Sequence, residues 1–228
     1  MIGVTENLKL VKDLLARAAR DAGRDAAAVR LLAVSKRQPP ERILEAAVAG
    51  QRDFGENVVQ EALPKIERTA GNDLVWHFIG RLQRNKTRAV AERFDWVHSI
   101  DRLQVAERLS RQRPDDLAPL NVCLQVDLDD EPAKDGAAPV DVPGLARSVS
   151  ELPRLRLRGL MCIPAVRDDF EAQRKPFRVL RELADFIRNE GIELDTLSMG
   201  MSGDYRAAVF EGATIVRIGT AIFGERTA

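Results

Sequence analysis

The chain alternates between short apolar runs and longer amphipathic stretches over nearly its whole length. The short runs are rich in Val, Leu and Ile and are bounded by polar residues, Gly or Pro, as buried strands are. They span 30–35, 51–55, 74–79, 94–100, 120–128, 155–161, 193–199 and 213–219. Apolar residues at helical spacing lie between them, at 40–49, 57–68, 83–92, 102–112, 142–150, 168–189 and 203–211. Strands that alternate with helices predict a parallel sheet built from βα units.

Eight strands are the number that closes a (β/α)8 TIM barrel, and a chain of 228 residues has a suitable length. We therefore predict a single α/β barrel domain spanning residues 1–228. The segment 220–228 that follows the last predicted strand is too short for a full helix. The segment from Thr5 to Asp21 has apolar residues at helical spacing. We expect this N-terminal helix to cover the gap after strand eight.

The run 120–128 alternates so regularly that its two faces can be assigned. Leu120, Val122, Leu124, Val126 and Leu128 share one face, and Asn121, Cys123, Gln125 and Asp127 share the other. We expect the apolar face to pack on helices and the mixed face to point into the barrel, with Gln125 and Asp127 near its mouth. Buried polar groups are costly unless they are hydrogen-bonded. Either loop backbone groups or a ligand must therefore satisfy this face.

Composition and charge argue against several classes of function. Lys plus Arg and Asp plus Glu both number 35, so the net charge is zero and no global attraction to nucleic acid or anionic membrane is expected. The two cysteines fall in apolar runs and predict buried reduced thiols, not a disulfide framework or a zinc site. No apolar signal region or membrane-length run is evident. We expect a cytoplasmic protein that binds no metal.

Two groups of polar residues have a structural interpretation that competes with a functional one. Arg81, Arg84, Lys86 and Arg88 could bind RNA, but their spacing and the neutral net charge favour a solvated helix face. His98, in "VHSID", has no metal-ligand partner at a fixed spacing, and we expect it to form a hydrogen bond at a strand end.

Barrels of this type place their active sites at the C-terminal ends of the strands. The last two predicted strands end in "SMGMSGD" (198–204) and "RIGT" (217–220). Glycines there let the backbone approach an anion, and Ser202 offers a hydroxyl and an expected helix N-cap. The following helix would present N–H groups to a phosphate, which barrels commonly bind at this place. The alternative is a pair of ordinary glycine turns.

Lys36 stands where the first predicted strand ends, just before Pro39 and Pro40. Strands one and eight are neighbours in a closed barrel, so Lys36 and Arg217 would lie side by side if both faced inward. A lysine that is desolvated beside another cation has a lowered pKa and becomes a nucleophilic amine, as a Schiff base requires. The alternative is a solvated lysine, because lysines are seldom buried.

Several segments in order resemble one family, the pyridoxal 5′-phosphate (PLP) homeostasis proteins, also called the YggS/PROSC family. They are "LLAVSK", "DFGENVVQEALPK", "WHFIGRLQRNKTR", "VHSID", "RGLMCIP", "LSMGMSGD" and "VRIGTAIFG", and they cover nearly the whole chain. The resemblance implies a PLP-binding barrel like the N-terminal domain of alanine racemase.

The resemblance also implies a role for each matching residue. Lys36 would hold PLP as an internal aldimine, and Arg217 would face the pyridine nitrogen. The residues implied to bind the phosphate are Ser202, Gly219 and Thr220. The residues implied to lie around the cofactor are Asn57, His77 and Met199.

The resemblance implies a carrier or regulator in intracellular PLP homeostasis, with PLP-dependent apo-enzymes as candidate recipients and no established turnover. A permanently charged Arg217 cannot take a proton, so it would keep the pyridine nitrogen unprotonated and weaken the electron sink. One alternative is a PLP enzyme such as a weak amino-acid racemase, for which His77 could be the acid opposite Lys36. Another is a barrel enzyme that uses Lys36 directly on a phosphorylated sugar. We expect a monomer, because no extra domain supplies an interface.

Two positions depart from the family's pattern. Arg81 stands where His or Pro is expected, and Asp135 stands where Ser is expected. Both fall in loops at the predicted mouth, the second within the longest irregular stretch, Asp129–Pro139, which predicts a mobile surface loop. We expect these departures to affect loop conformation and partner surface and not the cofactor pocket.

Overall fold

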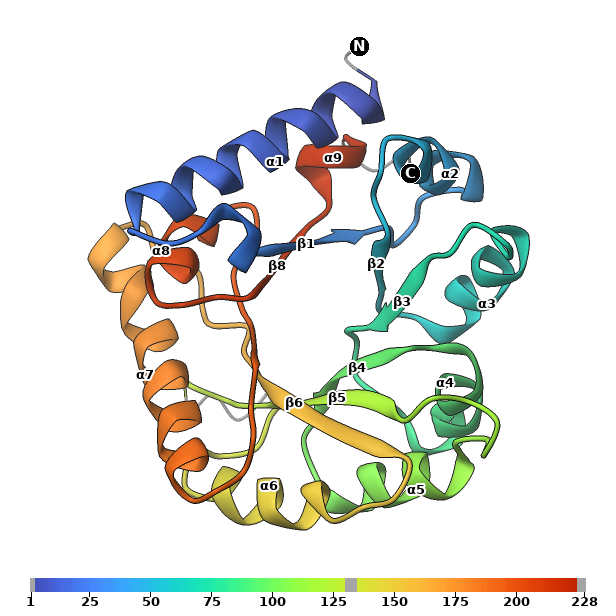
Figure 1. The fold of residues 1–228 in the computed structure, drawn as a ribbon, viewed down its shortest axis with the longest axis vertical. Helices are drawn as coiled ribbons and strands as arrows, with labels where there is room; N and C mark the ends of the chain where they lie inside the picture. The colour runs from blue at the N-terminus through green and yellow to red at the C-terminus, as the bar shows by residue number, and fades with distance from the viewer. Residues whose placement is uncertain (1–2, 130–134, 225–228) are drawn as a thin grey trace.

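The computed structural model describes residues 3–129 and 135–224. Their strands form one closed parallel barrel in the order β1 to β8, and helices surround it (Figure 1). The strands are β1 (Arg30–Val34), β2 (Asp53–Glu56), β3 (Val75–Phe78), β4 (Trp96–Ile100), β5 (Leu120–Gln125), β6 (Leu155–Met161), β7 (Thr196–Ser198) and β8 (Ile215–Ile218). This arrangement confirms the predicted (β/α)8 barrel.

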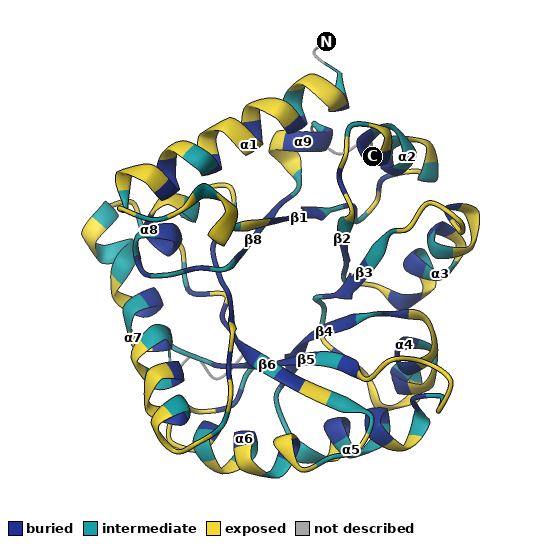
Figure 2. Ribbon diagram, viewed as in Figure 1, coloured by how far each residue is buried: buried dark blue, intermediate teal, exposed yellow. Residues whose placement is uncertain are grey.

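The described helices follow the predicted amphipathic stretches closely. They are α1 (Val4–Asp21), α2 (Pro40–Val48), α3 (Val59–Arg68), α4 (Thr87–Arg93), α5 (Leu103–Gln112), α6 (Val142–Ser150), α7 (Phe170–Asn189), α8 (Tyr205–Phe210) and α9 (Thr220–Phe223), with 3₁₀ turns at Ala26–Ala28 and Arg84–Lys86. Figure 2 shows buried residues on the inner faces of the helices and exposed residues on their outer faces. This division is the one that the apolar spacing predicts.

The N-terminal helix covers the gap after the last strand, as predicted. Helix α1 packs against α8 and the short α9. The Asn7 side-chain amide donates a hydrogen bond to the Ile222 carbonyl at 3.0 Å. Just beyond the helix, Arg24 donates to the Val209 carbonyl at 2.8 Å. The start of the chain therefore closes the helical layer beside its end.

The strands separate two apolar regions. Most buried residues form a layer between the strands and the helices, and a smaller cluster fills the barrel interior. The interior cluster consists of Leu32, Trp96, Cys123, Met161 and Ile215. In β5, Val122 and Leu124 belong to the outer layer and Cys123 to the interior, which confirms the predicted assignment of faces.

Several strands are shorter than the apolar pattern predicts. Strand β5 ends at Gln125, and beyond it the backbone bonds to a loop: Ala137 N–H donates to Gln125 O at 2.8 Å, and Asp127 N–H donates to Ala137 O at 3.0 Å. The apolar pattern continues because the loop residues are also partly buried at the mouth. Residues 130–134 of the predicted 129–139 loop lie outside the described residues.

Both thiols are unpaired and buried, as predicted. Burial raises the pKa of Cys123 and of Cys162 to about 12, so neither is a thiolate at neutral pH. No helix of the described residues combines the length and apolar composition needed to cross a membrane. Within the same residues, no three His, Cys, Asp or Glu side chains gather as a metal site would require.

Candidate functional site

A cavity of about 350 Å³ lies at the C-terminal mouth of the barrel. It is lined by six of the eight residues that the family resemblance implies around PLP: Lys36, Asn57, Ser202, Arg217, Gly219 and Thr220. They come from segments far apart in the chain, and the parallel strands bring them together because all the C-terminal strand ends meet at one rim. A volume of this size falls within the roughly 300–1,000 Å³ typical of small-molecule sites.

Lys36 lies in a tight turn immediately after β1. The Ser35 carbonyl accepts a hydrogen bond from Gln38 N–H at 3.0 Å, which closes the turn. Arg37 has a φ of 60°, in the left-handed region that residues other than glycine rarely adopt. Its N–H donates to the Glu61 carboxylate at 3.3 Å. The chain thus adopts a strained backbone conformation next to Lys36, as functional sites often do.

A buried ion pair anchors this turn from below. Glu56 and Lys65 lie 2.8 Å apart between Oε1 and Nζ, with both side chains buried. The Ser35 hydroxyl donates to the same Glu56 oxygen at 2.6 Å, and Lys65 also donates to the Ser35 carbonyl at 2.9 Å. Burial raises the pKa of Glu56, although the adjacent ammonium opposes this. We call these three residues the charged clamp; it fixes the residue that precedes Lys36.

Arg217 is almost completely buried at the base of the cavity. Its Nη1 donates to the Ser198 carbonyl at 2.6 Å and to the Ser198 hydroxyl at 2.8 Å, and its Nη2 donates to the Cys162 carbonyl at 2.8 Å. Burial lowers the pKa of this guanidinium, but a guanidinium still stays charged at neutral pH. Its hydrogen-bond partners here are neutral dipoles, and the Asp204 carboxylate acts on it only through space, so guanidinium N–H groups are not held by a carboxylate.

Strands β1 and β8 are neighbours, as predicted, with Leu32 opposite Arg217 in the register. Lys36 lies beyond this pair, in the turn above β1, while the Arg217 guanidinium bonds to residues at the ends of β6 and β7. The two cations therefore line the same cavity at different depths.

Two glycines shape the wall beside Arg217. Gly200 has a φ of 93°, and a Cβ there would lie 2.6 Å from the Cβ of Ala208. A Cβ on Gly219 would lie 2.9 Å from the Val34 carbonyl oxygen. Larger residues at these positions would push the turn after β7 or the start of α9 out of place.

The predicted N-cap is wrong by two positions. Helix α8 begins at Tyr205 with Asp204 as its N-cap residue, and the Asp204 carboxylate accepts from Met201 N–H at 2.6 Å. Ser202 is exposed and lines the cavity.

His77 and Met199 are not among the residues that line the cavity. Both side chains are fully buried. Met199 packs in the layer between strands and helices. His77 lies inside the barrel, where its Nε2 is 3.0 Å from Asp53 Oδ1 and its Nδ1 is 2.9 Å from His98 Nε2. His98 forms hydrogen bonds, as expected, but it lies within β4 and not at its end, and its partners are His77 and Ser198.

The two departures from the family's pattern meet at the rim. Arg81 Nε and Asp135 Oδ1 lie 3.1 Å apart, and both residues line the cavity. This placement corrects the expectation that they affect only loop conformation and partner surface. Met201 and Ile163 also line the cavity without having been singled out. Nothing in their residue types distinguishes them from core residues.

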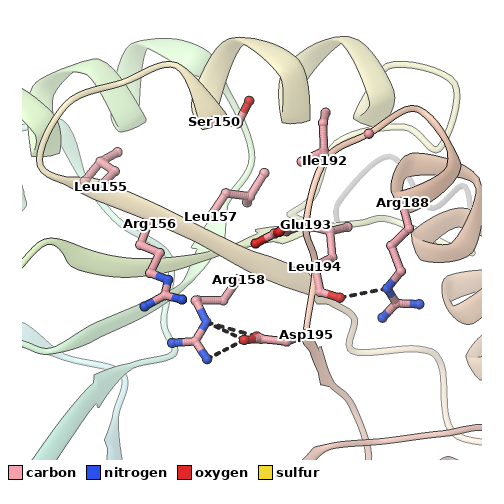
Figure 3. A pocket seen from close by; sticks show the side chains of 11 residues that line it. Ser150, Leu155, Arg156, Leu157, Arg158, Arg188, Ile192, Glu193, Leu194 and Asp195 are labelled. Carbon is pink, nitrogen blue, oxygen red and sulfur yellow. Dashed lines mark hydrogen bonds and ion pairs between the residues drawn. The ribbon is translucent and has the colours of Figure 1, made fainter.

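A larger cavity of about 780 Å³ lies at the opposite end of the barrel, near the starts of β6 and β7 (Figure 3). Two of its three arginines already bind groups of the protein. Arg158 makes a bidentate pair with Asp195 at 2.9 and 3.0 Å from Nε, and Arg188 donates to the Leu194 carbonyl at 2.7 Å. No Lys, Cys or His lies among its lining residues. The smaller cavity at the mouth is therefore the candidate site.

The comparisons with known proteins agree with this geometry. A model of the alanine racemase N-terminal domain matches residues 12–227. The pyridoxal phosphate homeostasis protein of Pseudomonas aeruginosa is 55% identical over 226 residues, which cover 99% of this chain and 97% of that protein. The protein of the same name from Escherichia coli K12 is 49% identical over 232 residues, with 99% and 98% covered.

The fold is also similar to those of proteins with solved structures. PipY from Synechococcus elongatus with PLP bound is 38% identical with a TM-score of 0.86, covering 97% of this chain and 100% of PipY. The alanine racemase of Corynebacterium glutamicum has a TM-score of 0.72 at 16% identity, covers 99% of this chain and 61% of the racemase, and shows the fold alone.

The fold and the cavity define a barrel of the alanine racemase N-terminal class. The sequence identity to two relatives that match along nearly their whole length assigns the chain to one family within that class. The chain belongs to the family of pyridoxal phosphate homeostasis proteins, which confirms the resemblance found in the sequence.

Proposed function

We propose that this chain binds PLP in the cavity at the barrel mouth and serves PLP homeostasis as a carrier or regulator. One observation carries the proposal: an amine, a buried cation and a turn with hydroxyl groups line a single cavity. PLP presents an aldehyde, a ring nitrogen and a phosphate, so each of its three polar ends meets a group of suitable chemistry. The names of the relatives and the PLP-bound PipY structure support the same assignment.

Different lining residues would recognise different parts of PLP. Lys36 would hold the cofactor through its primary amine. Ser202 and Thr220 would offer hydroxyl groups to the phosphate, and Gly219 would let the backbone approach it. Arg217 would offer its guanidinium to the ring nitrogen, and Asn57, which follows β2, would help to hold the ring. When bound, PLP supplies an aldehyde that condenses with amines and a ring that delocalises negative charge.

The proposal favours a carrier over a racemase because of where His77 lies. A racemase needs an acid on the face of the cofactor opposite Lys36. His77 is fully buried and bonded to Asp53 and His98, outside the cavity lining. Asp135, at the rim, is paired with Arg81. Neither group is placed to move a proton at the substrate carbon.

The first experiment is the visible spectrum of the purified protein, repeated with Lys36→Ala. We expect a yellow protein, loss of most of the visible band in Lys36→Ala, and an unchanged band in Lys9→Ala, which alters an exposed lysine of α1. Borohydride reduction followed by peptide mass spectrometry would place the added mass on the peptide that contains Lys36. A colourless protein that cannot be reconstituted with PLP would contradict the proposal.

The same preparations distinguish the alternatives. Racemised amino acid that disappears in Lys36→Ala would favour an enzyme. Phosphate binding without a chromophore would favour the sugar-phosphate enzyme. We further propose a cytoplasmic monomer that passes PLP to PLP-dependent apo-enzymes. Light scattering would give its mass, and transfer of PLP to an apo-enzyme faster than release into buffer would support direct delivery.

A further inference from the structure

A chain of buried hydrogen bonds crosses the barrel interior from Arg217 to the N-terminal end of β2. The Arg217 guanidinium donates to the Ser198 hydroxyl at 2.8 Å, which lies 2.7 Å from His98 Nδ1. His98 Nε2 lies 2.9 Å from His77 Nδ1, and His77 Nε2 lies 3.0 Å from Asp53 Oδ1. The chain connects residues of five strands, and Ser198 and both histidines are fully buried within it.

The two ends of the chain impose one direction on every hydrogen bond. A guanidinium only donates, and a carboxylate only accepts. Ser198 therefore accepts from Arg217 and gives its proton to His98 Nδ1. His98 then donates from Nε2 to His77 Nδ1, and His77 donates from Nε2 to Asp53. Every donor finds an acceptor when both imidazoles are neutral with their protons on Nε2, a tautomer assignment that follows from the network.

Protonation of either ring would break this order. A proton on His77 Nδ1 would face the N–H of His98, so two donors would meet. In the reverse direction the Ser198 hydroxyl would accept from both Arg217 and His98, and its own buried proton would lose the acceptor that His98 Nδ1 provides. Burial lowers the pKa of His77 and, more strongly, that of His98, so both rings resist protonation.

The surroundings of the two rings agree with neutrality. Trp96 stacks on His77 with ring centroids 5.3 Å apart, and the Arg158 guanidinium on β6 lies 5.0 Å from the centroid of the same Trp96 ring. The charged groups that act on the rings are Asp53, Asp95, Arg30 and Arg217. Arg30 lies 3.4 Å from Asp53 Oδ1 and balances that carboxylate at the outer end of the chain.

We propose that Ser198, His98 and His77 are positioning residues that hold the Arg217 guanidinium against the base of the PLP site, with Asp53 as the fixed end of the chain. Ser198, His98 and His77 each present their acceptor atom on the side of Arg217. The chain of hydrogen bonds therefore stabilises the buried cation without a carboxylate bonded to the guanidinium, which would compete with the ring nitrogen of PLP. Arg217 can then keep its charge and its direction toward the ligand. The inference rests on the proposed PLP site and adds residues that do not touch the ligand.

The first test needs no PLP, because it observes the imidazole rings themselves. The protein contains only two histidines, so their signals can be told apart. Nitrogen-15 NMR of tag-free protein, with His98→Gln for assignment, would show the state of each ring. We expect neither ring to titrate between about pH 5.5 and 8.5, both to be protonated on Nε2, and a scalar coupling to join His77 Nδ1 with His98 Nε2. A ring that titrates near its ordinary pKa of about 6.5, or that carries its proton on Nδ1, would overturn the chain.

The second test asks whether the chain acts through Arg217. Ser198→Ala should weaken PLP affinity about tenfold, because it leaves a guanidinium hydrogen unpaired and removes the donor to His98. The control is Ser110→Ala, which removes a buried hydroxyl of α5 that bonds to the Pro153 carbonyl outside the barrel interior and should leave affinity within about twofold. In an Arg217→Met background, Ser198→Ala should have no further effect.

These outcomes separate the two proposals. An undiminished PLP affinity in Ser198→Ala, or the same tenfold loss in the Arg217→Met background, would overturn the positioning role while the PLP site stands. If the wild-type protein takes up no PLP, the proposed function fails, and the imidazole signals alone decide whether the neutral chain exists.

Discussion

The two cations of the candidate site are supported by buried networks of opposite kinds. Below Lys36, the charged clamp pairs the Lys65 ammonium with the Glu56 carboxylate; Lys65 also donates to the Ser35 carbonyl, and Glu56 accepts from the Ser35 hydroxyl. Below Arg217, a hydroxyl and two imidazoles carry hydrogen bonds across the barrel. The first network positions a backbone turn, and the second positions a side chain directly.

The difference follows from what each cation must do. Lys36 is held through the backbone of the preceding residue, so a full ion pair can sit there without approaching the amine. Arg217 is held through its own guanidinium, so a carboxylate in the same place would neutralise the charge meant for the ligand. The two networks should therefore respond differently to the loss of one partner and to acid.

The largest expected effect is the loss of one half of the charged clamp. Glu56→Gln leaves a buried ammonium without its counter-charge, which should lower the free energy of unfolding by about 3–5 kcal/mol. The paired replacement Glu56→Leu with Lys65→Met should recover much of this loss, because neither charge then remains buried. Urea unfolding of the single and paired variants measures both values. A paired variant as unstable as Glu56→Gln would contradict the account.

Acid should reduce the stability that comes from the neutral rings of His77 and His98, and it should not reduce the stability that comes from the charged clamp. Both histidines have lowered pKa values when folded, so the unfolded chain binds more protons below about pH 6.5. Stability from the neutral rings is complete above that pH and is lost as the pH falls, by at most about 1.4 kcal/mol per pH unit for each ring. The raised pKa of Glu56 acts oppositely, and its contribution is lost as the pH rises.

The measurement is urea unfolding from about pH 7 to 5.5, a range in which unfolded carboxyl groups remain ionised. We expect the wild-type free energy of unfolding to fall by about 1–3 kcal/mol in this range. His77→Gln with His98→Gln should be less stable at pH 7 but nearly flat with pH. A slope that survives in this double variant would place the titrating groups elsewhere.

A smaller effect is expected at the strained turn beside Lys36. Arg37→Gly removes the side chain from a left-handed position and should stabilise the protein by up to about 1 kcal/mol, less the entropy that glycine adds to the unfolded chain. Arg37→Ala keeps the strain and removes only the long side chain, which makes it the matched control. Equal stability of the two variants would show that the backbone conformation there is not costly.

The smallest effect is expected at the rim. Arg81 is mostly exposed, so its ion pair with Asp135 should contribute no more than about 1 kcal/mol. Arg81→Ala should speed PLP release by at most about fivefold, and the difference from wild type should shrink at high salt. Arg84→Ala, a basic residue nearby that does not line the cavity, is the control. A change that persists in strong salt would point to contact with the ligand instead of the ion pair.

Much of the site could be predicted because it follows from strand order. Lys36, Asn57 and Thr220 all come directly after apolar runs, and a parallel barrel places all such positions at one rim. His77 and Met199 were harder to place, because a residue near a strand end can face the interior, the helices or the mouth. A shift of one residue in the strand register moves every side chain to the opposite face of the sheet, and the apolar pattern near a strand end does not specify the register.

The sequence by itself determined the eight alternating units, the barrel and the end of it that holds the cavity, because apolar periodicity encodes which face of each element is buried. Only the tertiary structure decided which polar groups meet. Ser198 bonds to His98 from across the barrel, 100 residues away, and Arg81 meets Asp135 from another loop. Such partners depend on distances and directions between strands that are not adjacent in the chain, and local patterning carries no information about them.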